Sequence, residues 1–349
     1  MELAAIAHQY RELFTANYAT RLLPSQRHAL SALLRCRTPA AGELQVRCTD
    51  CAQVRQQPLP CGHRSCPKCQ NHEATQWLDR QQAKLLPVEY FMITFTLPSE
   101  LRPLAWRHQH VLYTLFFDGV SGLLKDFGLT PKNLGADIGM TAVLHTHTRR
   151  LDYHPHVHVV VPGGGIDTRR RQWKKKKGKY LFSAFALAKV FRARFLAAVN
   201  AASLALPEKL PQKWVVDCTH VGKGLPALQY LSRYLYRGVI SENNIIENRD
   251  GKVTFQFTDS RTGATDTRTL NGEDFLWLVL QHVLPKGFRR VRDYGFLHGN
   301  AKQRLSLVQL VLRVMIDRPP PRRRPLFTCP HCQAPMTIVA VRRAAGRSG

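Results

Sequence analysis

Residues 151–165 read LDYHPHVHVVVPGGG, a β-forming run that contains a His-x-His pair and ends in Pro-Gly-Gly-Gly. Side chains of a strand alternate between its two faces, so His156 and His158 share one face while Val157 points to the other. The proline and glycines that follow are typical of a strand end. The stretch therefore predicts a strand over residues 154–161 that presents two imidazoles as ligands for one metal ion; a pair of solvated or hydrogen-bonded strand histidines is the alternative.

A second strand is expected just before it, over residues 140–148, so that the two form a hairpin with its turn near 151–152. With the turn there, residues whose numbers add to about 303 face one another, which places His145 opposite His158. We therefore expect a third metal ligand from the neighbouring strand, with His145 preferred. His147 and His154 remain alternatives for this third ligand, because a register error of one residue would reverse the choice.

A candidate pair of nucleophiles lies further along the chain, where residues 229–237 read QYLSRYLYR. Tyr230 and Tyr234 are four residues apart, so on a helix they share a face and either phenol could reach the same phosphate. Arg237 lies on that face and Arg233 beside it, where guanidinium groups can hold phosphate oxygens. Alone, such a stripe is more typical of a helix that packs on a core, so it counts as catalytic only together with the histidines.

The cysteine spacing indicates a structural zinc site near the N-terminus. Two Cys-x2-Cys pairs are separated by fourteen residues, which is typical of a tetrahedral site that holds a loop without an apolar core. Cys61 and His63 lie within the same loop and could replace one ligand or complete a second site. The four predicted Zn²⁺ ligands are Cys48, Cys51, Cys66 and Cys69.

A further cysteine pair, Cys329 and Cys332, follows the basic linker PPPRRRP at 319–325. Two thiols fill only half of a zinc shell, so the tail is expected to form an incomplete zinc ribbon. A zinc ion there would need ligands from another chain or from residues far away in the sequence. The candidates are Cys36, Cys61 and His63.

The composition indicates a polyanionic partner. The 349 residues include 51 Lys and Arg against 24 Asp and Glu, a formal charge of +27, while an apolar fraction of 44% supports a folded protein. We find no unbroken apolar run of the ~18 residues that a membrane span needs and no basic, apolar leader, so we expect a cytoplasmic protein without a membrane partner. Nucleic acid is the natural partner of such a chain.

One stretch concentrates this charge, since residues 169–179 read RRRQWKKKKGK. Charge without periodicity predicts a mobile loop there. An aromatic ring among lysines suits single-stranded nucleic acid, whose bases stack on the ring while its phosphates meet the cations; a merely solvated charged loop is the alternative. The candidate DNA-binding residues in this stretch are Arg171, Trp173, Lys174, Lys175 and Lys176, with Tyr180 next to them.

The order of helical and strand patterns predicts an α+β fold, with strands expected at 89–97, 140–148 and 154–161 and long helices between and after them. We divide the chain into three parts. Residues 1–84 form N-terminal helices and a zinc-binding domain, 85–318 form the domain with the histidines and tyrosines, and 319–349 form a basic linker and the incomplete zinc-ribbon tail.

In this order the motifs resemble the HUH-superfamily transposases of the insertion sequence 91 type, which move by a rolling-circle route. The resemblance rests on the cysteine-rich front, on LHT at 144–146, on 151–165 and on YLSRY at 230–234. It implies an antiparallel sheet with flanking helices and a catalytic Mg²⁺ or Mn²⁺. It also implies that His156 and His158 are metal ligands and that the paired tyrosines are nucleophiles.

The expected reaction follows from the resemblance and the chemistry of a phenol. A phenol of pKa about 10 is a poor nucleophile at neutral pH, so a cation must stabilise charge on the scissile phosphate. Attack by Tyr230 or Tyr234 would yield a 5′-phosphotyrosine and a free 3′-OH. The partners would be single-stranded transposon ends and target DNA, in the cytoplasm and nucleoid of a bacterium.

Three other functions fit parts of the same pattern. A plasmid replication initiator or a conjugative relaxase would use the same histidines and tyrosines. A non-catalytic, zinc-dependent DNA-binding regulator would need the cysteines but not the phenols. A metal-dependent hydrolase fits least, because it would want more convergent carboxylates and has no use for the high positive charge.

Overall fold

The computed structural model describes residues 1–69, 71–176, 178, 180–226, 228–229, 239–259, 262–314 and 327–343, with the backbone only for 71–75. The chain divides into two compact units. The cysteine-bearing unit comprises Met1–Glu73, Tyr236–Val283 and Pro319–Gly349, and the histidine-bearing unit comprises Ala74–Leu235 and Leu284–Arg318. This division differs from the predicted continuous domain over 85–318, because the described residues 239–283 belong with the N-terminal segment.

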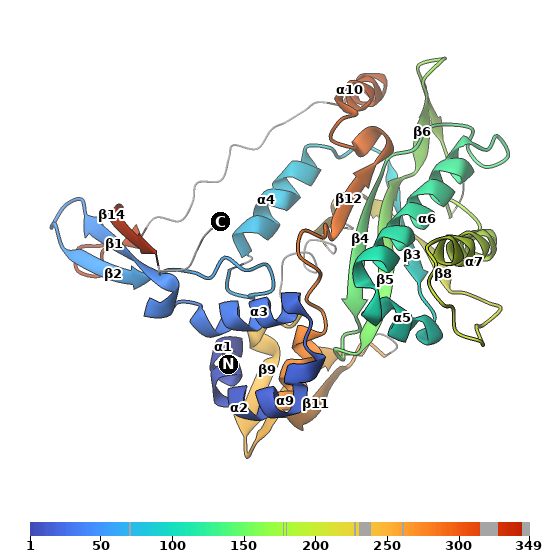
Figure 1. Ribbon diagram of the computed structural model, residues 1–349. Coiled ribbons are helices and arrows are strands. Elements are labelled where there is room, and N and C mark those ends of the chain that lie inside the picture. The colour runs from blue at the N-terminus through green and yellow to red at the C-terminus, as the bar shows by residue number, and fades with distance from the viewer. Residues whose placement is uncertain are drawn as a thin grey trace. The chain divides into compact units, whose positions relative to one another are not determined.

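The histidine-bearing unit contains a five-stranded sheet in the order β12-β4-β5-β3-β8 among the described residues (Figure 1). All four neighbouring pairs are antiparallel, which confirms the expected α+β class with an antiparallel sheet. The strands are β3 (Glu89–Thr96), β4 (Met140–His147), β5 (Tyr153–Pro162), β8 (Val216–Lys223) and β12 (Val291–Tyr294).

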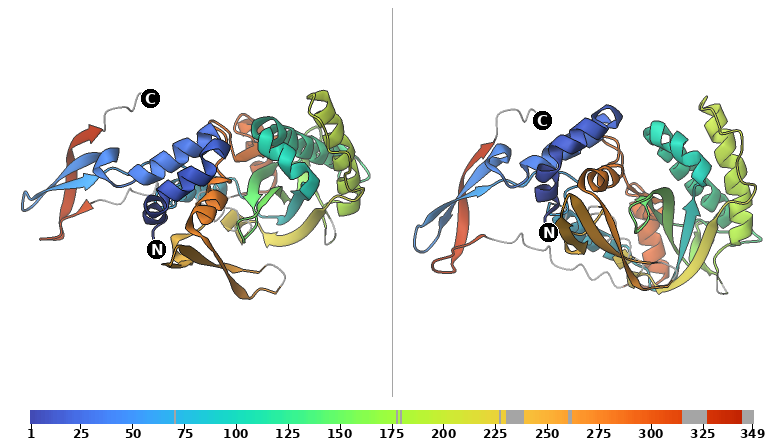
Figure 2. Two further views of the ribbon diagram at one scale, coloured as in Figure 1. Left: turned by 60° about the horizontal axis from the view of Figure 1, so that its bottom comes forward. Right: turned by 90° about the horizontal axis from the view of Figure 1, so that it is seen from below.

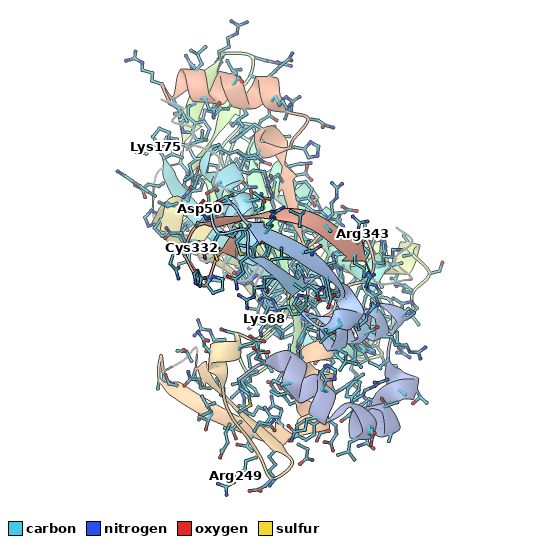
Figure 3. All side chains as sticks on the ribbon, turned by 90° about the vertical axis from the view of Figure 1, so that its left-hand side faces the viewer. Asp50, Lys68, Lys175, Arg249, Cys332 and Arg343 are labelled. Atoms are coloured by element: carbon cyan, nitrogen blue, oxygen red, sulfur yellow. The ribbon has the colours of Figure 1, made fainter. Side chains whose placement is uncertain are left out.

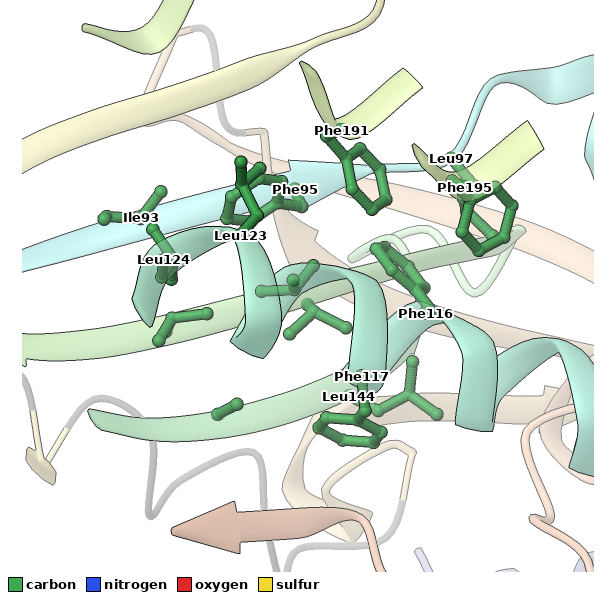
Figure 4. Packing of buried hydrophobic residues seen from close by; sticks show 14 of the residues in the cluster. Ile93, Phe95, Leu97, Phe116, Phe117, Leu123, Leu124, Leu144, Phe191 and Phe195 are labelled. Atoms are coloured by element: carbon green, nitrogen blue, oxygen red, sulfur yellow. The ribbon is translucent and has the colours of Figure 1, made fainter. Parts of the chain in front are cut away.

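Helices cover one face of this sheet and build the main core there. On α6, buried apolar residues recur every three or four positions, so one stripe of the helix faces the strands. Phe116 of α6 lies 5.5 Å from Phe191 of α7, ring centre to ring centre, and Phe95 of β3 lies 5.1 Å from Phe191. Leu144 of β4 belongs to the same buried cluster (Figure 4). The helices are η3 (Ser99–Leu101), α5 (Arg102–Arg107), α6 (Gln109–Leu129) and α7 (Ala184–Ala201).

The position of the core on one face of the sheet determines which face carries the histidines. Val157 and Val159 of β5 belong to the core under the helices. Because strand side chains alternate, His156 and His158 lie on the opposite face, as the sequence predicts.

The predicted mobile loop over 169–179 is wrong for part of its length, because a short hairpin forms there. Arg171 takes a left-handed conformation at its turn (φ 52°). Ile166 is buried, and the Trp173 ring lies 6.1 Å from that of Phe296, so apolar contacts order a segment that its charge alone suggested was mobile. The remaining elements of this part of the unit are β6 (Gly164–Asp167), β7 (Gln172–Lys175), η5 (Gly295–Leu297) and α10 (Lys302–Val311).

In the cysteine-bearing unit, the N-terminal helices pack on α9. Phe14 is fully buried, and Tyr18 stacks on Trp277 with ring centres 4.9 Å apart. A three-stranded sheet, ordered β11-β10-β9, precedes α9, and its strands β10 and β11 pair antiparallel from Lys252 opposite Asn271 to Thr258 opposite Thr265. These elements are α1 (Leu3–Gln9), α2 (Arg11–Tyr18), η1 (Ala19–Arg21), α3 (Pro24–Arg35), η4 (Glu242–Asn244), β9 (Ile245–Arg249), β10 (Lys252–Thr258), β11 (Thr265–Asn271) and α9 (Gly272–Leu280).

The same unit holds a four-stranded sheet that joins the two ends of the chain, in the order β13-β14-β1-β2 (Figure 2). Strand β14 pairs antiparallel with β1 from Gly42 opposite Arg343 to Cys48 opposite Met336. The tail is therefore part of the N-terminal zinc-binding region, in contrast to the separate domain expected at 319–349. The elements are η2 (Pro39–Ala41), β1 (Gly42–Cys48), β2 (Val54–Pro58), β13 (Phe327–Thr328) and β14 (Pro335–Arg343).

Helix α4 (Asn71–Gln82) follows the cysteine-rich segment. None of the described helices is both long and apolar enough to cross a lipid bilayer.

Candidate active site and metal centres

Three histidines from the adjacent strands β4 and β5 form a compact cluster. The ring centre of His145 lies 5.2 Å from that of His156 and 4.6 Å from that of His158, and the last two are 4.8 Å apart. One ligand nitrogen from each lies within 4.8 Å of the others. The structure therefore brings together the three residues that the sequence analysis selected, with the third from the neighbouring strand.

The predicted register of this hairpin is wrong by two residues. His145 pairs with His156, and Val143 with His158, so facing residues have numbers that add to 301 rather than 303. The register then shifts between His145 and His147, and His147 pairs with Tyr153. A slip of two residues keeps every side chain on its original face, and for that reason the predicted ligand set survives the wrong register.

The two alternative third ligands are placed differently. The ring of His147 lies 6.5 Å from that of His145, beyond the register shift. His154 Nδ1 accepts a hydrogen bond of 2.9 Å from the guanidinium of Arg102. Neither residue belongs to the group whose ligand atoms converge.

Hydrogen bonds at Nδ1 orient the rings on β5. His156 Nδ1 donates to the carbonyl oxygen of His154 at 2.7 Å, and His158 Nδ1 shares a hydrogen bond of 3.0 Å with Thr94 Oγ1. When Nδ1 donates, Nε2 carries the lone pair that can bind a metal. Such an outer hydrogen bond is typical of metal-ligating histidines because it sets both tautomer and ring direction.

Burial keeps the cluster in the neutral form that binds metals. Desolvation lowers the pKa of His156 to about 4 and that of His158 to about 3, with repulsion from neighbouring imidazoles adding to the effect. The same causes hold the pKa of His145 well below its ordinary value. Three neutral imidazoles on one face fit a divalent cation that keeps open positions for other ligands.

The predicted nucleophiles and their arginines, which are Tyr230, Tyr234, Arg233 and Arg237, lie outside the described residues. The segment leading to them begins a helical turn, since the Leu228 N–H donates to Gly224 O at 3.1 Å. The placement of the two phenols relative to the histidines therefore stays a prediction.

The cysteines form two four-thiol clusters among the described residues, and this corrects the predicted single site. Cys48 and Cys51 meet the tail cysteines, whereas Cys66 and Cys69 meet a second set of partners. Strand β2 lies within the fourteen-residue spacer and pairs back on β1, so the two Cys-x2-Cys pairs end in different places. The clusters are Cys36, Cys61, Cys66 and Cys69, and Cys48, Cys51, Cys329 and Cys332.

The first cluster has the dimensions of a zinc site. Its Sγ atoms lie 3.6 Å apart for Cys36 to Cys66, Cys36 to Cys69 and Cys61 to Cys69. A tetrahedron with Zn–S bonds of about 2.3 Å has edges of ~3.8 Å. Cys36 stands outside any Cys-x2-Cys pair, and the sequence suggests it only as a partner for the tail cysteines, whereas the structure places it in this cluster. The fit to four thiolates indicates a structural Zn²⁺.

His63, a predicted alternative ligand, lies beside the first cluster rather than in it. Its Nδ1 accepts a hydrogen bond of 3.1 Å from the Ser65 N–H, and its ring lies 5.3 Å from that of His28. Burial lowers the pKa of His63 to about 4. Four cysteines already complete the cluster, so His63 is not needed as a ligand.

The basic hairpin uses some of its predicted DNA-binding side chains internally. Lys174 Nζ donates to Gly135 O at 2.7 Å and lies 3.4 Å from Asp167 Oδ2, and Lys176 Nζ donates to Asn133 O at 3.4 Å. Trp173 is half-buried against Phe296, which differs from the exposed stacking platform that we expected. The exposed members of the predicted patch are Arg171, Lys175 and the neighbouring Tyr180.

A basic cleft of about 1280 Å³ lies in the same unit along β12, α6 and α10. Lys125 Nζ lies 5.4 Å from the centre of the Tyr294 ring. The Arg292 guanidinium lies 4.4 Å from the Phe117 ring centre and 3.8 Å from Asp118. These contacts hold the cations at the wall of the cleft, whereas Phe117 is fully buried and offers no surface for stacking.

Comparisons with known proteins agree with these features. Residues 139–304 match a family described as "Putative transposase", and residues 6–97 match "Transposase zinc-binding domain". The chain is 34% identical to "Putative transposase y4qJ" of Sinorhizobium fredii (strain NBRC 101917 / NGR234), a match that covers 88% of this chain and 83% of the relative. It is 29% identical to the transposase for insertion sequence element IS801 of Pseudomonas savastanoi pv. phaseolicola, over 94% and 85% of the two chains.

Among solved structures, the chain is similar to the conjugative relaxase TrwC in complex with mutant OriT DNA. The TM-score is 0.29 at 14% identity, and the match covers 65% of this chain and 74% of the relaxase.

Proposed function

Because the chain belongs to the transposase family of insertion sequences 91 and 801, we propose that it cleaves and rejoins single-stranded DNA through a 5′-phosphotyrosine. The observation that carries the proposal is the convergence of His145, His156 and His158 on the sheet face away from the core. Neutral, buried imidazoles that converge in this way suit a catalytic cation.

The proposed reaction uses the chain's own phenols. The oxygen of Tyr230 or Tyr234 attacks the phosphorus and the P–O3′ bond breaks; water takes the phenol proton and returns one to the leaving 3′ oxygen, which becomes a hydroxyl. A Mg²⁺ or Mn²⁺ held by the three histidines would stabilise the negative charge that develops on the phosphate oxygens. Attack of a 3′-OH on the phosphotyrosine reverses the step and joins the strands, so two tyrosines allow one strand to be held while another is cut.

The surface of the histidine-bearing unit supports a single-stranded substrate. Arg171 and Lys175 are exposed on the β6–β7 hairpin, and the Tyr180 side chain is 59% exposed beside them. A flexible strand can stack a base on such a ring while its phosphates contact the cations. We assign to Arg233 and Arg237, by their spacing from Tyr230, contacts with the scissile phosphate.

A covalent-adduct assay tests the proposal. The protein is incubated with labelled single-stranded element ends and Mn²⁺, and denaturing gels are read for a protein-DNA adduct. We expect the adduct with the native protein, a reduced amount with Tyr230→Phe or Tyr234→Phe, and none with the double variant. Tyr236→Phe serves as the matched control, because it removes a phenol from the same segment on a different helical face.

The histidines are tested in the same assay. His156→Ala/His158→Ala is expected to lose the adduct while still binding the strand, because the cations of the hairpin are unchanged. An adduct that persists in the Tyr230→Phe/Tyr234→Phe protein would refute the nucleophile assignment, and one that persists without the histidines would refute the metal role.

A further inference from the structure

The cysteine pair of the C-terminal tail lies against a cysteine pair from the start of the chain. Cys332 Sγ is 3.4 Å from Cys48 Sγ, although 284 residues separate them in sequence. Cys51 Sγ lies 3.6 Å from Cys329 Sγ and 3.6 Å from Cys332 Sγ. Figure 3 shows Cys332 beside Asp50, which stands in the turn between Cys48 and Cys51. The tail pair lies outside both family matches, which end at residues 97 and 304.

The distances between the sulfurs distinguish an ion site from disulfide bonds. A disulfide needs an S–S distance of about 2.05 Å, whereas the edges of a Zn-thiolate tetrahedron measure ~3.8 Å. The observed separations of 3.4 and 3.6 Å are close to the second value. All four Sγ atoms lie within 4.8 Å of one another.

The two turns that carry these thiols share one backbone hydrogen bond and one backbone conformation. In each, the N–H of the first cysteine donates to the carbonyl oxygen five residues later, at 2.9 Å. In each, the residue after the second cysteine has a left-handed conformation, which is uncommon for residues other than glycine: Ala52 has φ 56° and Gln333 has φ 61°. The bonds are Cys48 N to Gln53 O and Cys329 N to Ala334 O. Two turns built alike each present a pair of thiols to the same point.

The sheet around the cluster buries few apolar side chains. Its buried apolar group contains Val46, Ala334 and Met336 besides two of the cysteines. Most of β14 is exposed, including Ile338 at 54% and Val341 at 53%. So small a core does not by itself hold a strand, and domains of this kind are usually stabilised by a metal ion.

We propose that Cys48, Cys51, Cys329 and Cys332 bind a second zinc ion, which fastens the C-terminal strand β14 to β1. This site is independent of the strand-transfer chemistry and of the first cluster. Each cysteine pair supplies only two of the four ligands that a structural zinc ion needs, and the two pairs together complete one tetrahedral site.

The zinc content of purified protein tests the inference. The measurements use a His156→Ala/His158→Ala background, so that zinc in the histidine cluster does not contribute. We expect two equivalents of zinc in that background and in a further Cys218→Ser control, whose thiol lies outside both clusters. Cys329→Ser/Cys332→Ser should lose one equivalent, and hydrogen exchange at the β14 amides should become faster while α3 is unchanged.

A ligand swap separates metal binding from simple damage to the fold. Cys332 is exposed, so both Cys332→Ala and Cys332→His are sterically tolerable. The alanine variant should lose the second equivalent and the histidine variant should keep it, because imidazole nitrogen can replace a thiolate at zinc. Two equivalents retained in Cys329→Ser/Cys332→Ser, or one in the parent background, would overturn the proposal. Neither measurement depends on DNA cleavage.

Discussion

We expect the metal binding that we propose for the histidine cluster to remain strong in acid. The structure holds the pKa of His156 near 4 and that of His158 near 3. A lowered pKa means that the imidazole stays neutral, and able to bind metal, as the pH falls through the range in which an ordinary histidine becomes charged. The affinity for Mn²⁺ should therefore change little between pH 7.5 and pH 5.5.

The size of the effect follows from the protonation equilibrium. At pH 5.5 an imidazole with the ordinary pKa of about 6.5 is only ~9% neutral, so two such ligands would weaken binding by roughly 100-fold. With pKa values of about 4 and 3, His156 and His158 are each more than ~95% neutral at that pH, and the loss is less than about 1.2-fold. The pKa of His145 is also held well below its ordinary value, so this imidazole likewise stays neutral as the pH falls.

Electron paramagnetic resonance of free Mn²⁺ measures this affinity at each pH. Mn²⁺ prefers nitrogen and oxygen ligands to thiolates, so the cysteine clusters do not contribute. The His156→Ala/His158→Ala protein is the control, and it should not bind Mn²⁺ at any pH. A loss of affinity near 100-fold between pH 7.5 and 5.5 in the native protein would show that the imidazoles titrate normally, and the reasoning from burial would fail.

Two substitutions, each compared with a control substitution, test the packing of the histidine-bearing unit by urea unfolding. Phe116→Ala should lower the free energy of unfolding by ~3–5 kcal/mol because it empties a fully buried site, whereas Phe185→Ala, at a side chain 77% exposed, should change it by less than ~0.5 kcal/mol. Gly295→Ala should cost more than the ~1–2 kcal/mol of a left-handed L residue, because its Cβ would lie 1.8 Å from Ile138 O. Gly287 also has a positive φ, but a Cβ there would meet no atom within 4 Å, so Gly287→Ala should show only the cost of the left-handed conformation. Equal losses of unfolding free energy at the two glycines would contradict the predicted clash with Ile138.

The sequence by itself determined the features that depend on neighbouring residues. The alternation of apolar and polar side chains assigned His156 and His158 to the face away from the core, and this needed no knowledge of the register. His145 was also found from the sequence, because the actual register differs from the expected one by two residues and the face is the same. The charge of the 169–179 stretch, in contrast, misled us about its mobility, because the contact of Trp173 with Phe296 joins residues that are far apart in the chain.

Only the tertiary structure decided which cysteines share an ion. A Cys-x2-Cys spacing shows that two thiols can converge, but not which second pair they meet, since that depends on the path of the chain between them. Here the pairing of β2 with β1 separates Cys51 from Cys66, and the return of β14 brings Cys332 to Cys48. Local periodicity is a property of a few consecutive residues, whereas contacts across hundreds of residues follow from the packing of the whole fold.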